Sequence, residues 1–153
     1  MQPAALEDSI DIAATPDRVW ELVGDPRRMA EWSPQVTSVR LREGFDRVEV
    51  GAEFTNRNQI DELAWTTHAT VVRLEPGREL AFRIAENWVV WSYTVEPTET
   101  GCRLIERREA PEGLSDLSAQ WTDKYLGGQD AFTALMRSDV HTTLEAIRAA
   151  AEA

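Results

Sequence analysis

The chain has 153 residues, of which 42% are hydrophobic and 28% charged, a balance that is typical of globular proteins and excludes a disordered chain. Acidic residues number 27 and basic residues 16, so the net charge of −11 argues against nucleic acids and anionic membrane surfaces as partners. The length fits one domain over residues 1–153.

The beginning of the chain carries signals for one strand and two short helices. Residues 8–13 alternate between polar and apolar side chains, which predicts a strand. A Thr–Pro pair then supplies an N-cap and a first helical position for a helix over about 16–23. An Asp–Pro pair repeats this signal and predicts a second short helix over about 26–31.

From residue 36 to residue 110 the pattern has the two-residue period of strands. Turn signals separate the strands, and Glu75-Pro76-Gly77-Arg78 suits a type II turn, with proline second and glycine third. Because the connections are short, we expect antiparallel hairpins arranged as a meander. The expected strands cover residues 36–43, 51–60, 64–74, 79–86, 89–96 and 102–109.

Helical spacing returns in the last part of the chain. A helix is predicted over about 116–126, and Gly127-Gly128 interrupts it because each interior glycine costs about 1 kcal/mol relative to alanine. A longer amphipathic helix follows over about 130–151, with apolar residues at a spacing of three and four. At 1.5 Å per residue it spans about 33 Å, enough to cross a sheet.

This order of elements resembles the helix-grip fold of the START and pollen-allergen-like superfamily. The segment IDIAATPDRVWELVGDPRRMAEWSPQV, residues 10–36, looks like the opening of bacterial polyketide cyclase/dehydrase and lipid-transport-like proteins. Later segments are similar to the same proteins in order and spacing: FTNRN, WTTHATVVRLEPGRELAFRI, WSYTVEP and TTLEAIRA. The resemblance covers residues 8–151. It implies an α+β fold, an antiparallel sheet of about seven strands around the long C-terminal helix, but not one reaction.

In such a fold, strand alternation decides which side chains face the helix and which face solvent. The face that carries Phe54 is clearly the inner one, and Ala81 and Ser92 are assigned to the outer face. Residues 64–74 are apolar on both faces, so there the resemblance decides. The resulting expected ligand-binding residues are Trp32, Asn56, Asn58, Trp65, Thr67, Phe82, Trp91, Tyr93, Glu106, Arg108, Trp121, Tyr125, Phe132 and Met136.

This inner face is aromatic with a few polar groups, which is the profile of a small-molecule pocket. The alternative is a filled core in which each polar group is satisfied by a neighbour. Asn56 and Asn58 illustrate both interpretations, since they could bond a ligand carbonyl or their strand neighbours.

Three charged residues are candidates for catalysis. Glu106 and Arg108 share one strand face two residues apart, so they could orient a polar ligand head, or Glu106 could act as a base beside a cation. The alternative is an ion pair at the cavity rim. Asp139 stands where relatives tend to have glycine, and it either adds a carboxylate to the cavity or lies in water at its rim.

Aromatic residues also mark both ends of the expected cavity. Trp32 precedes Ser-Pro in a loop and is either a gate for ligands or a hydrophobic plug under the short helices. Leu117, Trp121 and Tyr125 form a stripe on one helix. That helix is either a lid hinged at the two glycines that follow it or an ordinary docked helix.

The remaining reactive residues predict no other chemistry. His68 and His141 are expected to be exposed and Cys102 to be a buried, inert thiol, so no nucleophilic triad is predicted. One cysteine and two histidines are too few for a structural zinc site, and we expect no metal or other cofactor. The single cysteine and the lack of a long apolar run predict a cytoplasmic protein without a membrane span. Lys124 is the only lysine among the 16 basic residues, an arginine bias that is typical of a GC-rich bacterial genome.

Three hypotheses of function follow. The first is binding, transport or sequestration of a small hydrophobic molecule such as a lipid, an isoprenoid or a polyketide-like aromatic. The second is a polyketide aromatase/cyclase, with Glu106 or Asp139 as base and Arg108, Tyr93 or Asn58 as donors. Its acidic carrier-protein partner would require a basic patch such as Arg27, Arg28, Arg40 and Arg42. The third is a protein-interaction module or homodimer that covers an aromatic Trp32–Trp121 surface.

Overall fold

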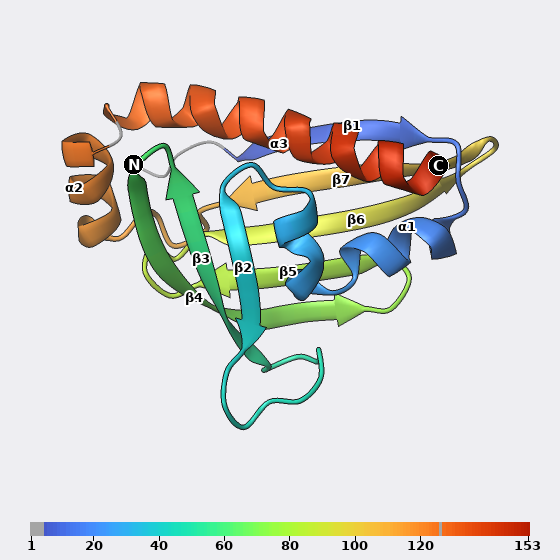
Figure 1. The fold of residues 1–153 in the computed structure, drawn as a ribbon, viewed down its shortest axis with the longest axis horizontal. Helices are drawn as coiled ribbons and strands as arrows, with labels where there is room; N and C mark the ends of the chain where they lie inside the picture. The colour runs from blue at the N-terminus through green and yellow to red at the C-terminus, as the bar shows by residue number, and fades with distance from the viewer. Residues whose placement is uncertain (1–4, 126) are drawn as a thin grey trace.

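In the computed structural model, which describes residues 5–125 and 127–153, one antiparallel sheet of seven strands has a long helix lying across it (Figure 1). The strand order is β1-β7-β6-β5-β4-β3-β2. Strands β2 to β7 therefore form a meander, and β1 pairs with β7 as the edge strand beyond it. The predicted helix-grip fold is confirmed. The strands are β1 (Leu6–Ile12), β2 (Val36–Leu41), β3 (Glu53–Ile60), β4 (Leu63–Glu75), β5 (Glu79–Ile84), β6 (Val90–Thr98) and β7 (Gly101–Glu109).

The helices begin where the capping signals predicted. In α1 (Pro16–Val23), Thr15 Oγ1 accepts a hydrogen bond from the backbone N–H of Arg18 at 3.1 Å. The second segment, η1 (Pro26–Glu31), is a 3₁₀ helix, a form that proteins use in short pieces. The last two helices are α2 (Asp116–Tyr125) and α3 (Gln129–Glu152), and the predicted last residue of α2, position 126, lies outside the described residues.

The connection between β4 and β5 is the predicted type II turn. Gly77 has a φ of 79°, a value that glycine adopts readily and other residues do not. The backbone N–H of Arg78 donates to the carbonyl of Glu75 at 2.9 Å, which closes the turn. This turn keeps β4 and β5 adjacent, and β4 carries one wall of the site described below.

The space between the sheet and α3 differs between its two ends. Toward the C-terminus of α3, Leu144 and Ile147 are at most 1% exposed and belong to the same apolar core as Val19 and Leu22 of α1. Toward its N-terminus α3 meets α2, which covers that end of the sheet (Figure 1). The fold therefore has a filled half beneath α1 and leaves room for a cavity at the other end.

The outer face of the sheet differs from expectation in one detail. Ala81 and Ser92, predicted to face solvent, are at most 5% exposed. They lie side by side on β5 and β6, between Arg73 of β4 and Arg107 of β7 in register. Because the aliphatic stems of arginine cover small neighbours while their charged ends stay in water, these two positions are buried without a second layer.

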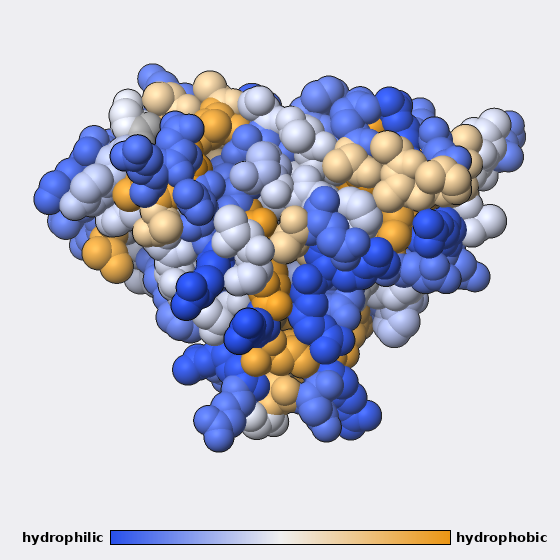
Figure 2. Space-filling view, viewed as in Figure 1, coloured by the Kyte–Doolittle hydropathy of each residue, from blue (hydrophilic) through white to orange (hydrophobic). Residues whose placement is uncertain are grey.

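Seen from the side of α3 and β2, the surface is mostly hydrophilic (Figure 2). Hydrophobic side chains gather in the lower part of this view, where the loop between β2 and β3 lies (Figure 2). Val50 of that loop is 61% exposed, whereas Phe45 and Val48 pack against the core. Within residues 5–125 and 127–153, no helix combines the length and the apolar character that crossing a membrane requires.

Candidate ligand-binding cavity

A cavity of about 420 Å³ lies between the sheet, α2 and the N-terminal half of α3. Small-molecule sites in proteins usually occupy about 300 to 1,000 Å³, so the volume is within the ordinary range. Its lining comes from the inner faces of β3 to β7, from the segment between η1 and β2, and from the two C-terminal helices. One concave surface thus collects residues that are distant in sequence.

Aromatic and aliphatic side chains together form the apolar wall. Phe82 and Trp91 are neighbours on β5 and β6, and Phe132 of α3 lies above the sheet. At the α2 end, the ring centroids of Trp65 and Trp121 are 5.0 Å apart, a separation typical of favourable aromatic pairs. This contact connects α2 to β4 and closes one end of the cavity, whereas the lid motion of α2 stays a prediction.

Tyr93 and Glu106 form a buried polar pair on the floor of the cavity. They are directly opposite each other on β6 and β7, both are at most 5% exposed, and their side chains share a hydrogen bond. Burial raises the pKa of Glu106 to about 8; the bond from Tyr93 opposes this rise, and the nearby carboxylate of Asp8 adds to it. The Glu106 carboxyl is therefore mostly protonated at pH 7.

Burial affects both residues of this pair. The pKa of Tyr93 is raised well above its ordinary value, first by burial and then by the charge of Glu106 and the hydrogen bond with it. Oε1 of Glu106 is buried and has no hydrogen-bond partner among the described residues. One oxygen of a neutral acid is thus left unsatisfied at a wall of the cavity.

Arg108 lies two residues beyond Glu106 on β7 and brings a positive charge into the cavity. Its guanidinium carbon is 5.9 Å from the ring centroid of Trp91 and 5.4 Å from that of Phe132, which is cation–π geometry. Burial lowers its pKa to about 10, so the group is still charged at pH 7. No ion pair or hydrogen bond within the described part of the chain involves this guanidinium, so the ion pair with Glu106 considered above is not formed.

Two asparagines lie on the β3 wall, where they bond the neighbouring strand. Nδ2 of Asn58 donates to Thr67 Oγ1 at 3.2 Å and to the carbonyl of Trp65 at 3.4 Å, and Nδ2 of Asn56 donates to the same hydroxyl at 3.4 Å. Oδ1 of Asn56 has no partner in the described structure. The amide groups are thus held by β4, and one buried oxygen remains for a ligand donor.

Asp139 of α3 also lines the cavity. Its Oδ2 accepts a hydrogen bond from the side-chain amide of Gln35, which precedes β2. Burial raises the pKa of this carboxyl, and the bond from Gln35 opposes the rise. The partner was not predictable, because no local pattern indicates that residues 35 and 139 meet.

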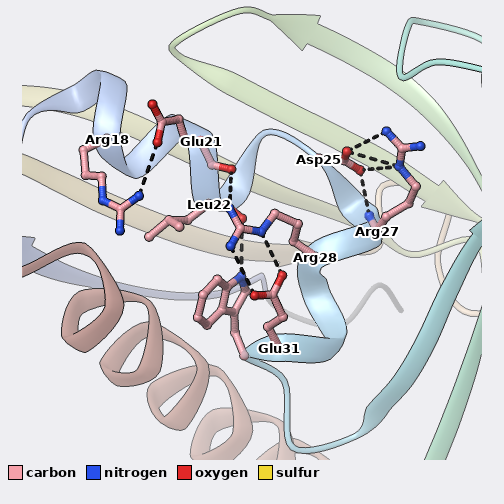
Figure 3. Close-up of polar contacts among 8 residues, drawn as sticks. Arg18, Glu21, Leu22, Asp25, Arg27, Arg28 and Glu31 are labelled. Carbon is pink, nitrogen blue, oxygen red and sulfur yellow. Dashed lines mark hydrogen bonds and ion pairs between the residues drawn. The ribbon is translucent and has the colours of Figure 1, made fainter. Parts of the chain in front are cut away.

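Two residues expected at the site, Trp32 and Tyr125, do not line the cavity. The indole Nε1 of Trp32 donates to the carbonyl of Leu22 at 3.3 Å, and its ring packs against the core, as a plug under the short helices would. Arg28 lies over that ring, 5.5 Å from its centroid, and is held by Glu31 and by the carbonyl of Glu21 (Figure 3). Tyr125 is 49% exposed and stacks on the far side of Trp121.

The other twelve expected ligand-binding residues, and the additional catalytic candidate Asp139, all line the cavity. Thirteen further lining residues were not among the expected ligand-binding residues, and most of them come from loops or helices, where strand alternation gives no information. These are Met29, Ser33, Gln35, Val36, Thr66, Ile84, Glu86, Asn87, Leu117, Ser118, Thr122, Val140 and Thr143.

In the described part of the chain, the two histidines contact carboxylates and the cysteine is buried, so they form no nucleophilic triad. Nδ1 of His68 is 2.6 Å from Glu86 Oε2, and His141 lies 3.4 Å from Asp8 on the outside of α3. Cys102 is fully buried, and burial raises the pKa of its thiol. Among the residues that the structure describes, no three His, Cys, Asp or Glu side chains are grouped so that they could hold a metal.

Comparison with known proteins identifies the family of this chain. A family model described as polyketide cyclase / dehydrase and lipid transport matches residues 3–152. A polyketide-cyclase-like protein from Corynebacterium glutamicum is 33% identical, with a TM-score of 0.60 over 94% of this chain and 88% of its own. No protein with a curated description is significantly similar.

More distant structures share the fold. A protein from Nitrosomonas europaea is 14% identical, with a TM-score of 0.66 over 95% of this chain and 92% of its own. The di-domain ARO/CYC protein BexL from the BE-7585A biosynthetic pathway is 20% identical, with a TM-score of 0.71 over 98% of this chain and 50% of its own. The match over nearly the whole sequence shows that this chain belongs to the polyketide cyclase/dehydrase and lipid-transport family.

Proposed function

We propose that the protein binds one small hydrophobic molecule in the cavity between the sheet and α3. The observation that carries this proposal is a cavity of about 420 Å³ whose exposed surface is mostly apolar in area, although many polar side chains also contribute to its lining. An apolar ligand in this space would remove apolar wall from contact with water, which is the main favourable contribution to binding of this kind. Binding of this kind requires no covalent chemistry.

A matched pair of substitutions tests the site. Val140 of α3 is 2% exposed and lines the cavity, so Val140→Phe would fill part of it. Val72 of β4 is 37% exposed and lies outside the lining, so Val72→Phe adds the same bulk elsewhere. We expect a neutral probe, 2-naphthalenemethanol, to bind with one-to-one stoichiometry in calorimetry, and only Val140→Phe to weaken it, by about tenfold or more.

Equal affinity in the two variants would place the probe outside the cavity and contradict the proposal. Native mass spectrometry of the protein purified from its own host gives a second measurement. An additional mass that survives gentle ionisation and disappears after organic extraction is expected from a retained hydrophobic molecule.

The aromatase/cyclase alternative is favoured by the protonated Glu106 beside the charged Arg108. A neutral acid and a cation in a water-poor cavity are suited to stabilising the enolate that forms during cyclisation. Because Glu106 holds its proton at pH 7, Asp139 is the better candidate for the base. If the protein is such an enzyme, Glu106→Gln and Asp139→Asn should each slow turnover of a model diketide by about a hundredfold, and unchanged rates would exclude these roles.

The surface gives this alternative less support. Three of the four arginines considered for binding an acidic carrier protein are already paired: Arg27 with Asp25 at 2.7 Å, Arg28 with Glu31 at 2.8 Å and Arg42 with Glu53 at 2.9 Å. Paired charges attract a distant acidic partner weakly. The interaction-module hypothesis also has less support, since Trp32 packs against the core rather than forming an open surface with Trp121. Ligand binding is therefore the function that the geometry supports best.

A further inference from the structure

Within residues 5–125 and 127–153, Arg108 has no counter-charge within ion-pair distance in the cavity. Its neighbours across the strands and from α3 are Leu6, Trp91 and Phe132, none of which can neutralise it. The nearest inward carboxyl on its own strand is Glu106, which is neutral at pH 7. Arg108 keeps part of its surface exposed, but the lowered pKa shows that its charge is largely desolvated, and natural proteins normally pair a cation in such a position.

We infer that the natural ligand is an apolar molecule with a single carboxylate, which the Arg108 guanidinium binds as its counter-ion. This inference rests on the proposed function, because it identifies the chemical class of the molecule in the same cavity. A guanidinium presents a planar fork of N–H donors that matches the two oxygens of a carboxylate. The rings of Trp91 and Phe132, each within 6 Å of the guanidinium carbon, hold this fork in place.

The groups around Arg108 favour a monoanion over a more highly charged head. Arg108 is the only cationic side chain among the described residues that line the cavity, whereas Glu86, Glu106 and Asp139 all bring carboxyl groups there. Asp8 lies opposite Glu106 on β1, with His141 of α3 on its solvent side. A second negative charge on the ligand would have no cation and would face these acids, so a phosphate ester fits less well than a carboxylate.

Glu106, two residues before Arg108 on β7, adds selectivity for a carboxylate. Its protonated carboxyl has a buried oxygen, Oε1, with no partner in the described part of the chain, while Tyr93 bonds the same group from β6. A carboxylate on Arg108 would offer an acceptor close to this acid, since inward residues two apart on a strand are about 7 Å apart along it. The acid would donate to the ligand only while it is protonated, so binding should weaken as Glu106 ionises near pH 8.

The test compares acids with matched alcohols by isothermal titration calorimetry at pH 7. One pair is aromatic, 2-naphthoic acid and 2-naphthalenemethanol; the other is aliphatic, decanoic acid and decanol. The variants are Arg108→Met, which removes the charge, and Arg108→Lys, which keeps it but loses the fork. Arg107→Met is the control, because Arg107 is adjacent in sequence, faces the other side of the sheet and pairs with Glu109 at 3.0 Å.

We expect the unaltered protein and Arg107→Met to bind at least one acid about tenfold or more tightly than its alcohol. Arg108→Met should bind acid and alcohol equally, and Arg108→Lys should keep a reduced preference. Tighter binding of the naphthoic acid would assign the natural ligand to the aromatic acids, and tighter binding of decanoic acid would assign it to the aliphatic acids. The acid's advantage should fall between pH 7 and pH 9 in the unaltered protein and stay constant in Glu106→Gln.

The outcomes separate the two proposals. If acid and alcohol bind the unaltered protein with equal affinity, the carboxylate inference is overturned and hydrophobic binding stands. A preference for the acid that survives Arg108→Met also overturns it, because the charge would then lie elsewhere. If neither member of either pair binds, the proposed function itself fails and the inference fails with it.

Discussion

Replacing Glu106 by glutamine should remove a large pH dependence from the stability of this protein. The pKa of Glu106 is raised from 4.5 to about 8, first because the group is buried. Between these two values the folded chain holds a proton that the unfolded chain releases, so stability falls as pH rises. The loss is about 1.4 kcal/mol per pH unit, or about 5 kcal/mol over the window, with full stability below pH 4.5 and a plateau above about pH 8.

Urea unfolding at pH 5, 6, 7 and 8.5 would measure this difference. Relative to Glu106→Gln, the unaltered protein should lose several kcal/mol across the series, whereas Glu109→Gln should follow the unaltered protein closely. Glu109 is on the same strand but forms a surface ion pair with Arg107, and such pairs contribute less than about 1 kcal/mol. A constant difference between the unaltered protein and Glu106→Gln would mean that Glu106 ionises normally in the fold.

Gly101→Ala should be the most damaging single methyl addition that the backbone geometry indicates. An alanine Cβ at this position would lie 2.2 Å from the carbonyl oxygen of Ile12 and 2.8 Å from that of Ala14. Both are backbone atoms, so relief requires the start of β7 to move away from the end of β1. Overpacking and the φ of 152° together should cost about 3 kcal/mol or more, which lowers the melting temperature by roughly 6 to 12 °C.

Gly77→Ala separates the close contact from the backbone conformation. Gly77 also has a positive φ, 79°, but no atom lies within 4 Å of the position that its Cβ would take. This variant should cost only about 1 to 2 kcal/mol, the conformational penalty alone. If the two variants melt at the same temperature, the contact between β1 and β7 is not the reason for glycine at position 101.

The secondary structure was predictable where local chemistry decides it. The threonine and aspartate caps, the Pro-Gly turn at Gly77 and the alternation along each strand all act within a few residues. The 3₁₀ form of η1 was not predictable in this way, because a six-residue helix gains too little from either hydrogen-bond pattern for sequence to distinguish them. Alternation did not indicate the burial of Ala81 either, because its neighbours in register are Arg73 of β4 and Ser92 of β6.

The cavity was predictable mainly for residues on strands and helices, where a regular spacing assigns side chains to one face. Alternation placed Asn56, Trp91 and Arg108 on its wall, because a two-residue period leaves just two choices of face. It gave no information about Gln35, which reaches Asp139 from a loop. Nor did it indicate how deeply Glu106 is buried, since that depends on Tyr93, Asp8 and the roof of α3 together.

The position of β1 in the sheet has a kinetic consequence. β1 and β2 are the first two strands in sequence, yet they form opposite edges, and β1 pairs only with β7. Leu6 therefore cannot pair until Arg108 has been synthesised. The interval between the two residues is roughly 5 to 20 s at ordinary rates of translation. Such distant pairing slows folding. The floor of the cavity cannot be complete on a ribosome until β7 has emerged, and its roof also requires α3, so the ligand binding proposed above would follow the synthesis of both elements.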